Sequence, residues 1–347
     1  MKQSNLKICG IITEYNPFHQ GHAHHLRQAR ELTGCDVLVC ILSDYFSQRG
    51  LPSVMSWQDK TRLALEHGAD LVIRLPSVYA AQSADHFARY ALESLSVLGV
   101  QEIVFGSECH DRSRLEAMAD EAGLRPVNPA TSQARNLPDL EPNDILGVQY
   151  ILQCRRLGID WSTIPRSPDF ISATASRRAF FAGDAVDWQI YMQPEQRWES
   201  YYPCLRLSLL MTDPDRLASF FLVSEGIEHR LIQAAREHRD WQGFLEAAVS
   251  RTYSRARIQR TCLMILLQVT WSQMRDHDSF YHVLPAGFNA AGQALLRNLD
   301  EEARARTAMK FAQLPPFLKL VETKSAQLYD SVMKAPCSRE TIIRKGS

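Results

Sequence analysis

The sequence carries no net charge and contains no long apolar run. Thirty-nine lysines and arginines balance thirty-nine aspartates and glutamates in 347 residues. This balance excludes a strong global attraction to nucleic acid, so such a partner would need a local basic patch. The longest apolar runs, such as residues 262–267, are too short to cross a bilayer, and Lys7 interrupts the start that a signal peptide needs. We therefore expect a cytoplasmic protein without a membrane partner.

Several cysteine and glycine motifs are also missing. The eight cysteines form no C-x-x-C pair, and several lie in apolar runs, as Cys40 does. They are typical of small core residues in a reducing compartment rather than of a disulfide framework. No G-x-x-x-x-G-K-[ST] loop is present, and no G-x-G-x-x-G follows the first apolar run. Kinases, P-loop ATPases and dehydrogenases therefore lose their main support.

What is present in the first half is an alternation of strands and helices. Runs that are apolar on both faces, as strands of a buried parallel sheet should be, occupy residues 8–13, 37–42, 71–75 and 102–105. A fifth unit adds an expected strand at residues 160–164. Helical patterns lie between them at residues 23–33, 58–67, 85–98, 114–121 and 144–157. This order predicts an α/β fold with a doubly wound, Rossmann-like parallel sheet.

The second half has a different texture. Residues 205–280 show long helical patterns, and residues 257–271 fit one helix with a broad apolar face. The length also exceeds what one hydrophobic core usually fills. We therefore predict a sheet domain over residues 1–186 and a C-terminal α-helical domain over residues 187–347.

The segment Asn-Pro-Phe-His-x-Gly-His at residues 16–22 is the most informative motif. It follows the first expected strand, at the edge of an α/β sheet where ligands collect, and it leads into a helix whose N-terminus suits phosphate. Gly21 would let the backbone approach a ligand. His19 and His22 could each donate a hydrogen bond, as neutral or cationic rings, to oxygens that gain charge during attack on a phosphorus.

The histidines and Glu14 of this region allow other roles. A zinc site built from the four histidines of residues 19–25 is disfavoured, because His24 and His25 point in different directions on a helix and no cysteine pair or carboxylate lies nearby. Glu14 could position a substrate amine or a magnesium-bound water, or it could cap the following turn. We leave these alternatives open and predict no protein metal site.

A second candidate segment opens a probable helix at residues 171–178. Thr174 and its hydroxylated neighbours could hold phosphates at the helix start, and Arg177 or Arg178 could neutralise them. The alternative is an ordinary helix cap with solvated arginines. Beside the histidine segment, these residues are the expected second half of a triphosphate clamp.

A third segment is basic. Residues 251–260 contain four arginines and no acid, and Tyr253 could stack on an RNA base. On one helix, the first two arginines would pair at i,i+4 and the last two at i,i+3. The alternative is a solvated basic face. The candidate RNA-binding residues are Arg251, Tyr253, Arg255, Arg257 and Arg260.

Taken together, the first two segments resemble the H-x-G-H nucleotidyltransferase superfamily. More narrowly, residues 14–19, 48–52, 68–76, 105–108, 143–150, 224–227 and 251–260 resemble the bacterial tRNA(Met) cytidine acetate ligase family. The resemblance implies that ATP, with Mg²⁺, and acetate give acetyl-adenylate and pyrophosphate. The acetyl group would then pass to N4 of the wobble cytidine of elongator tRNA(Met), and the basic segment would contact the tRNA.

The resemblance also implies a set of ATP-binding residues, to which the proposed clamp adds the last three. The set is Ile12, Thr13, Glu14, Tyr15, Asn16, Pro17, Phe18, His19, Gln20, Gly21, His22, His25, Gly106, Asn143, Arg166, Thr174, Arg177 and Arg178. Within this set, His19 and His22 would be catalytic.

The sequence departs from the family pattern at three places, which makes it a divergent member. The loop of residues 167–170 is shorter, Asp44 stands where glycine is commoner, and Trp57 stands where lysine is commoner. Two alternative hypotheses follow: a nucleotidyltransferase that adenylates a phosphorylated metabolite or activates another acid, and an inactive nucleotide-binding relative.

Overall fold

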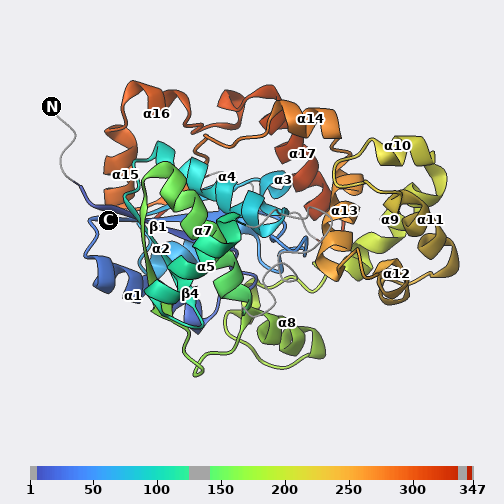
Figure 1. Ribbon diagram of the computed structural model, residues 1–347, viewed down its shortest axis with the longest axis horizontal. Helices are drawn as coiled ribbons and strands as arrows, with labels where there is room; N and C mark the ends of the chain where they lie inside the picture. The colour runs from blue at the N-terminus through green and yellow to red at the C-terminus, as the bar shows by residue number, and fades with distance from the viewer. Residues whose placement is uncertain (1–5, 125–140, 335–341, 346–347) are drawn as a thin grey trace.

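A seven-stranded sheet organises the protein (Figure 1). The computed structural model describes residues 6–124, 141–334 and 342–345. The strand order is β5-β4-β1-β2-β3-β6-β7, and all neighbours are parallel except the β3–β6 pair. The strands are β1 (Ile8–Thr13), β2 (Val37–Ser43), β3 (Leu71–Leu75), β4 (Glu102–Ser107), β5 (Asp160–Pro165), β6 (Pro285–Phe288) and β7 (Ile343–Arg344).

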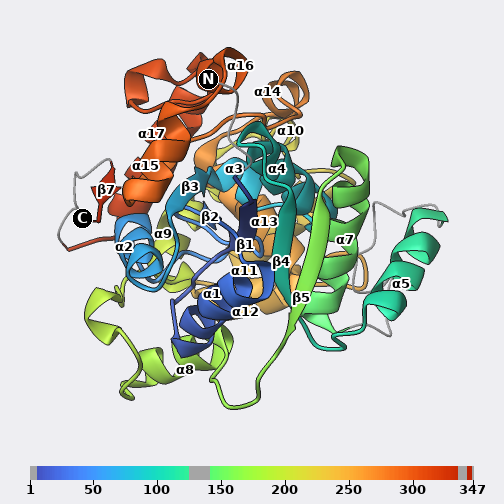
Figure 2. The same cartoon turned by 90° about the vertical axis from the view of Figure 1, so that its left-hand side faces the viewer.

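Helices cover both faces of the sheet (Figure 2). Alternate residues of each strand contribute to two separate apolar cores, as Ile8 and Cys9 of β1 do. Helices α1 and α2 pack into one core, and α4 and α7 pack into the other. The helices of this half are α1 (Gln20–Thr33), α2 (Trp57–Glu66), α3 (Ser77–Ala80), α4 (Ala84–Val97), α5 (Arg112–Leu124), α7 (Pro142–Leu157) and α8 (Ala173–Ala182). The predicted doubly wound α/β core is confirmed.

The strand order reverses between β1 and β4. The chain moves outward through β2 and β3 on one side of β1, and through β4 and β5 on the other. At such a switch point the connections leave in opposite directions and open a crevice at the carboxyl ends of the strands. The segment after β1, including His19, therefore lies beside the end of β4 at Ser107.

A group of helices stands beyond the sheet, as Figure 1 shows for α9 to α12. These helices are α9 (Trp198–Met211), α10 (Pro214–Ala218), α11 (Ile227–Glu237), α12 (Trp241–Ala248), α13 (Arg255–Leu267) and α14 (Trp271–Asp276). The single helix predicted for residues 257–271 is wrong. Gln268 adopts a left-handed conformation with φ of 50°, which ends α13 before Thr270 caps α14.

The chain then returns to the sheet, which the sequence analysis did not foresee. Strands β6 and β7 extend the sheet beyond β3. Between these two strands the chain forms α15 (Ala290–Arg297), α16 (Glu301–Ala305) and α17 (Pro316–Asp330). Gly287 is required there, because a Cβ would lie 2.6 Å from Thr61 Cγ2 and 2.8 Å from the Ile343 carbonyl oxygen. The division at residue 186 stays a prediction. In the described part of the chain, no helix has the length and apolar character to span a membrane.

Candidate active site

The two histidines of the H-x-G-H segment cap helix α1 reciprocally. His19 is the N-cap residue, and its Nδ1 accepts a hydrogen bond from the Gly21 backbone N–H at 3.1 Å. The Nδ1 atom of His22 accepts from the His19 backbone N–H at 3.3 Å. This is the geometry of a capping box, with imidazoles in place of the usual hydroxyl and carboxylate. Because both Nδ1 atoms act as acceptors, each neutral ring carries its proton on Nε2 as a donor.

The environment keeps both rings neutral. The rings stack with centroids 3.7 Å apart, and His19 is buried. Burial is the main cause that lowers the pKa of His19 to about 4, and Arg166 adds to the effect while Asp187 opposes it. Burial, followed by the neighbouring His19, holds the pKa of His22 well below its usual value. The site thus presents two neutral N–H donors rather than imidazolium ions.

Gly21 has a second reason to be glycine. A Cβ at this position would lie 2.9 Å from His19 Cε1 and 3.2 Å from Phe170 Cβ. Gly21 was predicted to allow close approach of a ligand. The imidazole of His19 itself occupies the space beside this residue, so glycine leaves room for the ring.

Buried residues hold the segment from below. Tyr15 and Phe18 are almost fully buried, and their ring centroids lie 4.7 Å and 5.7 Å from that of His22. The Asn16 side chain is buried too, and it donates to the Pro52 carbonyl oxygen at 3.1 Å and accepts from the Val54 N–H at 2.9 Å. These side chains form the frame of the loop, and their predicted role in ATP binding stays a prediction.

Glu14 and Lys60 fix the loop that follows β2. The Glu14 carboxylate accepts a hydrogen bond from the Gln48 backbone N–H, so it caps a distant loop rather than the following turn. The buried Lys60 ammonium donates to the carbonyl oxygens of Glu14, Ser43 and Asp44 at 3.2, 2.7 and 2.9 Å. Burial lowers the pKa of Lys60 to about 7. Sequence reasoning missed Lys60, since nothing in its local pattern marks a lysine that points inward.

Glu108, just after β4, accepts hydrogen bonds from three other residues. Its carboxylate accepts from Asn143 Nδ2 at 2.7 Å, pairs with Arg166 Nη1 at 3.0 Å, and accepts from the Asp144 N–H at 3.1 Å. A Cβ on Gly106 would meet only Arg166 Cγ, at 3.9 Å. The three residues that the family resemblance placed here thus converge, and Arg166 is close enough to lower the pKa of both histidines across the crevice. Glu108 itself was not among the predicted site residues.

The two arginines of α8 are not equivalent. Ser172 caps the helix, Arg177 donates to the Asn16 carbonyl oxygen, and its second nitrogen lies 3.2 Å from Thr174 Oγ1. Burial lowers the pKa of Arg177. Arg178 is exposed. Arg177 therefore joins α8 to the H-x-G-H segment, and Arg178 is the more accessible cation for an incoming phosphate.

The remaining ATP-binding residues differ in accessibility. Gln20 is exposed at the start of α1, Ile12 is partly buried, and Thr13 donates to the Ile41 carbonyl oxygen at 3.2 Å. The Nε2 atom of His25 is buried with no hydrogen-bond partner in the described structure. Across the described residues, no group of three or more histidines, cysteines, aspartates or glutamates could hold a metal ion.

Asp44 and Trp57, two of the departures from the family pattern, lie against the same buried arginine. Asp44 is fully buried, where it accepts from Ser77 Oγ at 2.6 Å. The Arg74 guanidinium lies 4.0 Å from the Asp44 carboxylate and 4.7 Å above the Trp57 ring. It also forms an ion pair with Glu322 of α17. A buried arginine therefore contacts both Asp44 and Trp57.

The basic segment differs from its prediction. Tyr253 is buried, and its hydroxyl donates to the Glu225 carbonyl oxygen at 3.0 Å, so it cannot stack on a base without leaving the core. Arg251 precedes the helix, because Ser254 caps α13, and the expected i,i+4 pair with Arg255 is therefore wrong. Arg251 and Arg255 are both exposed.

The other two arginines of the segment are more enclosed. Arg257 binds Ser224 Oγ at 2.9 Å. Burial and the nearby Arg257 lower the pKa of Arg260 to about 10. Both lie on α13, as the i,i+3 pairing requires.

Comparisons with known proteins agree with this geometry. The family described as HIGH Nucleotidyl Transferase matches residues 6–128 and 125–342. A tRNA(Met) cytidine acetate ligase from Limosilactobacillus fermentum is 33% identical over 331 residues, covering 86% of this chain and 88% of the relative. The enzyme of the same name from Listeria monocytogenes is 33% identical over 378 residues, covering 95% and 96%. The chain belongs to the tRNA(Met) cytidine acetate ligase family.

Solved structures show the same fold. A crystal structure of Thermotoga maritima TmcAL bound with alpha-thio ATP matches with a TM-score of 0.83 at 24% identity, covering 98% of this chain and all of the other. The apo form of that protein matches equally well at 25% identity. As a member of the tRNA(Met) cytidine acetate ligase family, the chain is an enzyme with a nucleotidyltransferase core.

Proposed function

We propose that this enzyme activates acetate with ATP and transfers the acetyl group to N4 of the wobble cytidine of elongator tRNA(Met). The names of its relatives support the substrate, and the ATP analogue in the Thermotoga maritima structure supports the nucleotide. The observation that carries the proposal is the pair of neutral imidazoles at the mouth of β1, whose Nε2–H donors stand across the crevice from Arg166.

The first step is attack of an acetate oxygen on the α-phosphorus of ATP. The bond from this phosphorus to the bridging oxygen breaks, and pyrophosphate leaves. Negative charge grows on the α-phosphate oxygens, and fixed N–H donors from His19 and His22 stabilise it more than they stabilise the ground state. Arg178, with Arg177 anchored beside it, would hold the departing pyrophosphate.

In the second step, the cytidine N4 amine attacks the acetyl carbonyl carbon. The bond to the AMP oxygen breaks, AMP leaves, and the amine loses a proton. Arg251 and Arg255 offer exposed positive charge for the tRNA backbone. Mg²⁺ would arrive as part of the ATP substrate, because magnesium in nucleotide sites is held largely by phosphates and water. It would neutralise the triphosphate there.

Acetate-dependent ATP–pyrophosphate exchange tests the first step without RNA. We expect His22→Ala to lower the exchange rate by about 10²–10³, the cost of losing one fixed donor. His229→Ala is the control, because that ring lies exposed on α11. Unchanged exchange in His22→Ala would remove the mechanism. Exchange that requires a phosphorylated metabolite instead of acetate would favour the metabolite-adenylating alternative.

The second step is tested in cells. Mass analysis of tRNA nucleosides from cells lacking this protein should show loss of N4-acetylcytidine. Expression of the wild-type chain should restore it, whereas His22→Ala should not.

A further inference from the structure

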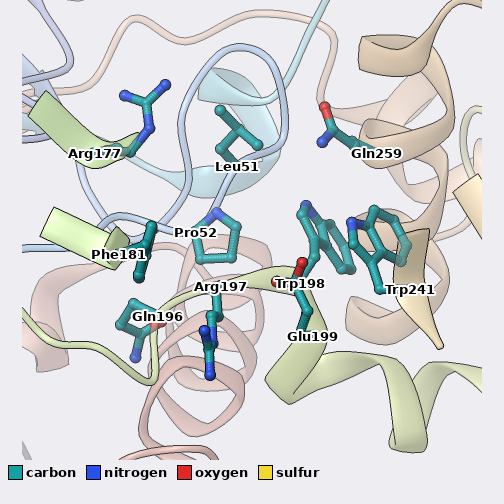
Figure 3. A pocket seen from close by; sticks show the side chains of 10 residues that line it. All are labelled: Leu51, Pro52, Arg177, Phe181, Gln196, Arg197, Trp198, Glu199, Trp241 and Gln259. Carbon is teal, nitrogen blue, oxygen red and sulfur yellow. The ribbon is translucent and has the colours of Figure 1, made fainter. Parts of the chain in front are cut away.

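A second cavity lies beside the H-x-G-H segment. It has a volume of about 270 Å³ and lies where the loop after β2, helix α8 and the start of α9 meet α12 and α13 (Figure 3). Its lining consists of Leu51, Pro52, Arg177, Phe181, Gln196, Arg197, Trp198, Glu199, Trp241 and Gln259. None of these residues except Arg177 was part of the predicted site.

The walls are largely apolar and aromatic. Trp198 and Trp241 stack with centroids 4.7 Å apart and planes at 14°. Phe181 is 37% exposed, so part of its ring is open to a ligand. Figure 3 shows Phe181 and Gln259 on opposite sides, with Leu51 and Pro52 between them. Such a lining suits a flat ring that leaves water on binding.

One polar group interrupts this lining. The Gln259 side chain is 7% exposed and lines the cavity, and Figure 3 shows its amide pointing into it. A ligand in the cavity can therefore bond this amide in place of water. An amide both donates and accepts, so it matches the edge of a nucleobase, as glutamine does in other nucleic-acid sites.

The rim carries Arg177 and Arg197 together with one exposed acid, Glu199. Arg197 is exposed and its guanidinium lies 5.8 Å from the centre of the Phe181 ring. Arg177, on the other side, donates to the Asn16 carbonyl oxygen of the active-site loop. A flat polar ring that carries an anionic backbone would satisfy the walls, the amide and the rim together.

The cavity is also tied to the reaction site. Its wall at residues 51–52 belongs to the loop that Glu14 binds at Gln48 and Asn16 binds at Pro52. Gly50 presses this loop onto α13, because a Cβ there would lie 2.8 Å from the Arg260 backbone nitrogen. A ligand in the cavity therefore touches the loop that the H-x-G-H segment holds.

We propose that this cavity receives one unstacked base of the tRNA strand that carries the acceptor nucleotide. The proposal rests on the proposed function, since it assumes a tRNA substrate. Phe181 and the apolar wall contact the face of the base, Gln259 bonds its edge, and Arg197 contacts the adjoining phosphate. This region is thus a base-binding subsite between the sheet and the helices beyond it.

Two variants test the subsite. Gln259→Leu removes the amide and keeps the side chain's bulk, and Phe181→Ala removes the exposed ring. Each should raise the KM for tRNA about fivefold or more, because one base contact of either kind is worth about 1 kcal/mol, which is about a factor of five. Acetate-dependent pyrophosphate exchange, which needs no RNA, should stay at the wild-type rate. Gln242→Leu on the exposed face of α12 is the matched control and should change neither quantity.

The outcomes separate the two proposals. A wild type without acetate-dependent exchange contradicts the proposed function itself. If the wild type exchanges and acetylates tRNA but both variants keep its KM, the subsite is refuted and the proposed function stands. Loss of exchange in both variants would also refute it, because the cavity would then serve the fold. Phe181→Ala keeps the test decisive if Gln259→Leu fails to fold, since its ring is at the surface.

Discussion

Replacing Gly21 by alanine should separate stability from activity in this enzyme. Gly21 is the second residue of α1, and a Cβ there would meet the His19 ring at 2.9 Å from Cε1 and 3.0 Å from Nδ1. The ring cannot simply slide away, because it stacks on His22 at 3.7 Å. The substitution therefore displaces the imidazole that we assign to the α-phosphate.

The expected effect on stability is small because two contributions oppose each other. Alanine in a helix is favoured over glycine by about 0.5–1 kcal/mol. Displacement of His19 weakens the N-cap, at a cost of about 0.5–2 kcal/mol. The free energy of unfolding should thus change by about 1.5 kcal/mol or less. Activity has no such compensation, and loss of one fixed donor should lower the exchange rate by about 10²–10³.

Urea unfolding and acetate-dependent pyrophosphate exchange measure the two quantities on the same preparation. Gly123→Ala in α5 is the control, since its Cβ would meet only Leu152 Cδ2, at an ordinary 3.6 Å. A Gly21→Ala enzyme that exchanges at nearly the wild-type rate would refute the reasoning, because the position of the His19 ring would then not matter. A large loss of stability would refute the energetic part.

Three further predictions concern pH and RNA. Burial lowers the pKa of His19 from 6.5 to about 4. Between these pH values the His19 ring stays neutral in the folded protein, whereas it takes up a proton in the unfolded chain. Stability should therefore fall as pH falls from 6.5 to 4, and urea unfolding should show a smaller fall in His19→Asn. Arg255→Ala should weaken tRNA binding and reduce its salt dependence in a gel shift, because this exposed arginine can reach phosphate. Tyr253→Phe should leave tRNA binding unchanged and cost about 1 kcal/mol of stability, because it loses one buried hydrogen bond. A tRNA affinity that responds to Tyr253→Phe but not to Arg255→Ala would contradict this assignment.

The sequence was sufficient to place the first five strands. The first four are apolar on both faces, and the predicted starts of all five agree with the structure at Ile8, Val37, Leu71, Glu102 and Asp160. Such strands are recognisable because a parallel sheet buried between helices needs this pattern. The H-x-G-H segment was also recognisable from the sequence. The three-residue spacing of its histidines is that of a capping box, so this spacing could have predicted the reciprocal cap.

The misses share one physical cause, which is dependence on residues far away in sequence. Strands β6 and β7 are short, and Gly287 of β6 makes sense only against Thr61 and Ile343. The Tyr253 ring is buried, and its hydroxyl donates to the carbonyl oxygen of Glu225, which lies before α11. The charge of Glu108 acquires its role only when α7 and the end of β5 bring Asn143 and Arg166 to it. A local hydrophobic pattern cannot predict contacts between residues that are far apart in sequence.

The return of the chain to the sheet at β6 has a consequence for engineering this protein. Because β6 pairs with β3 after the distal helices, those helices are topologically an insertion that leaves the sheet near α8 and comes back at Pro285. A truncation at residue 186 would strip the outer edge of β3 and remove Glu322, the partner of the buried Arg74. Excising the distal helices would instead need two cut points, with the C-terminal segment that carries β6, α17 and β7 retained.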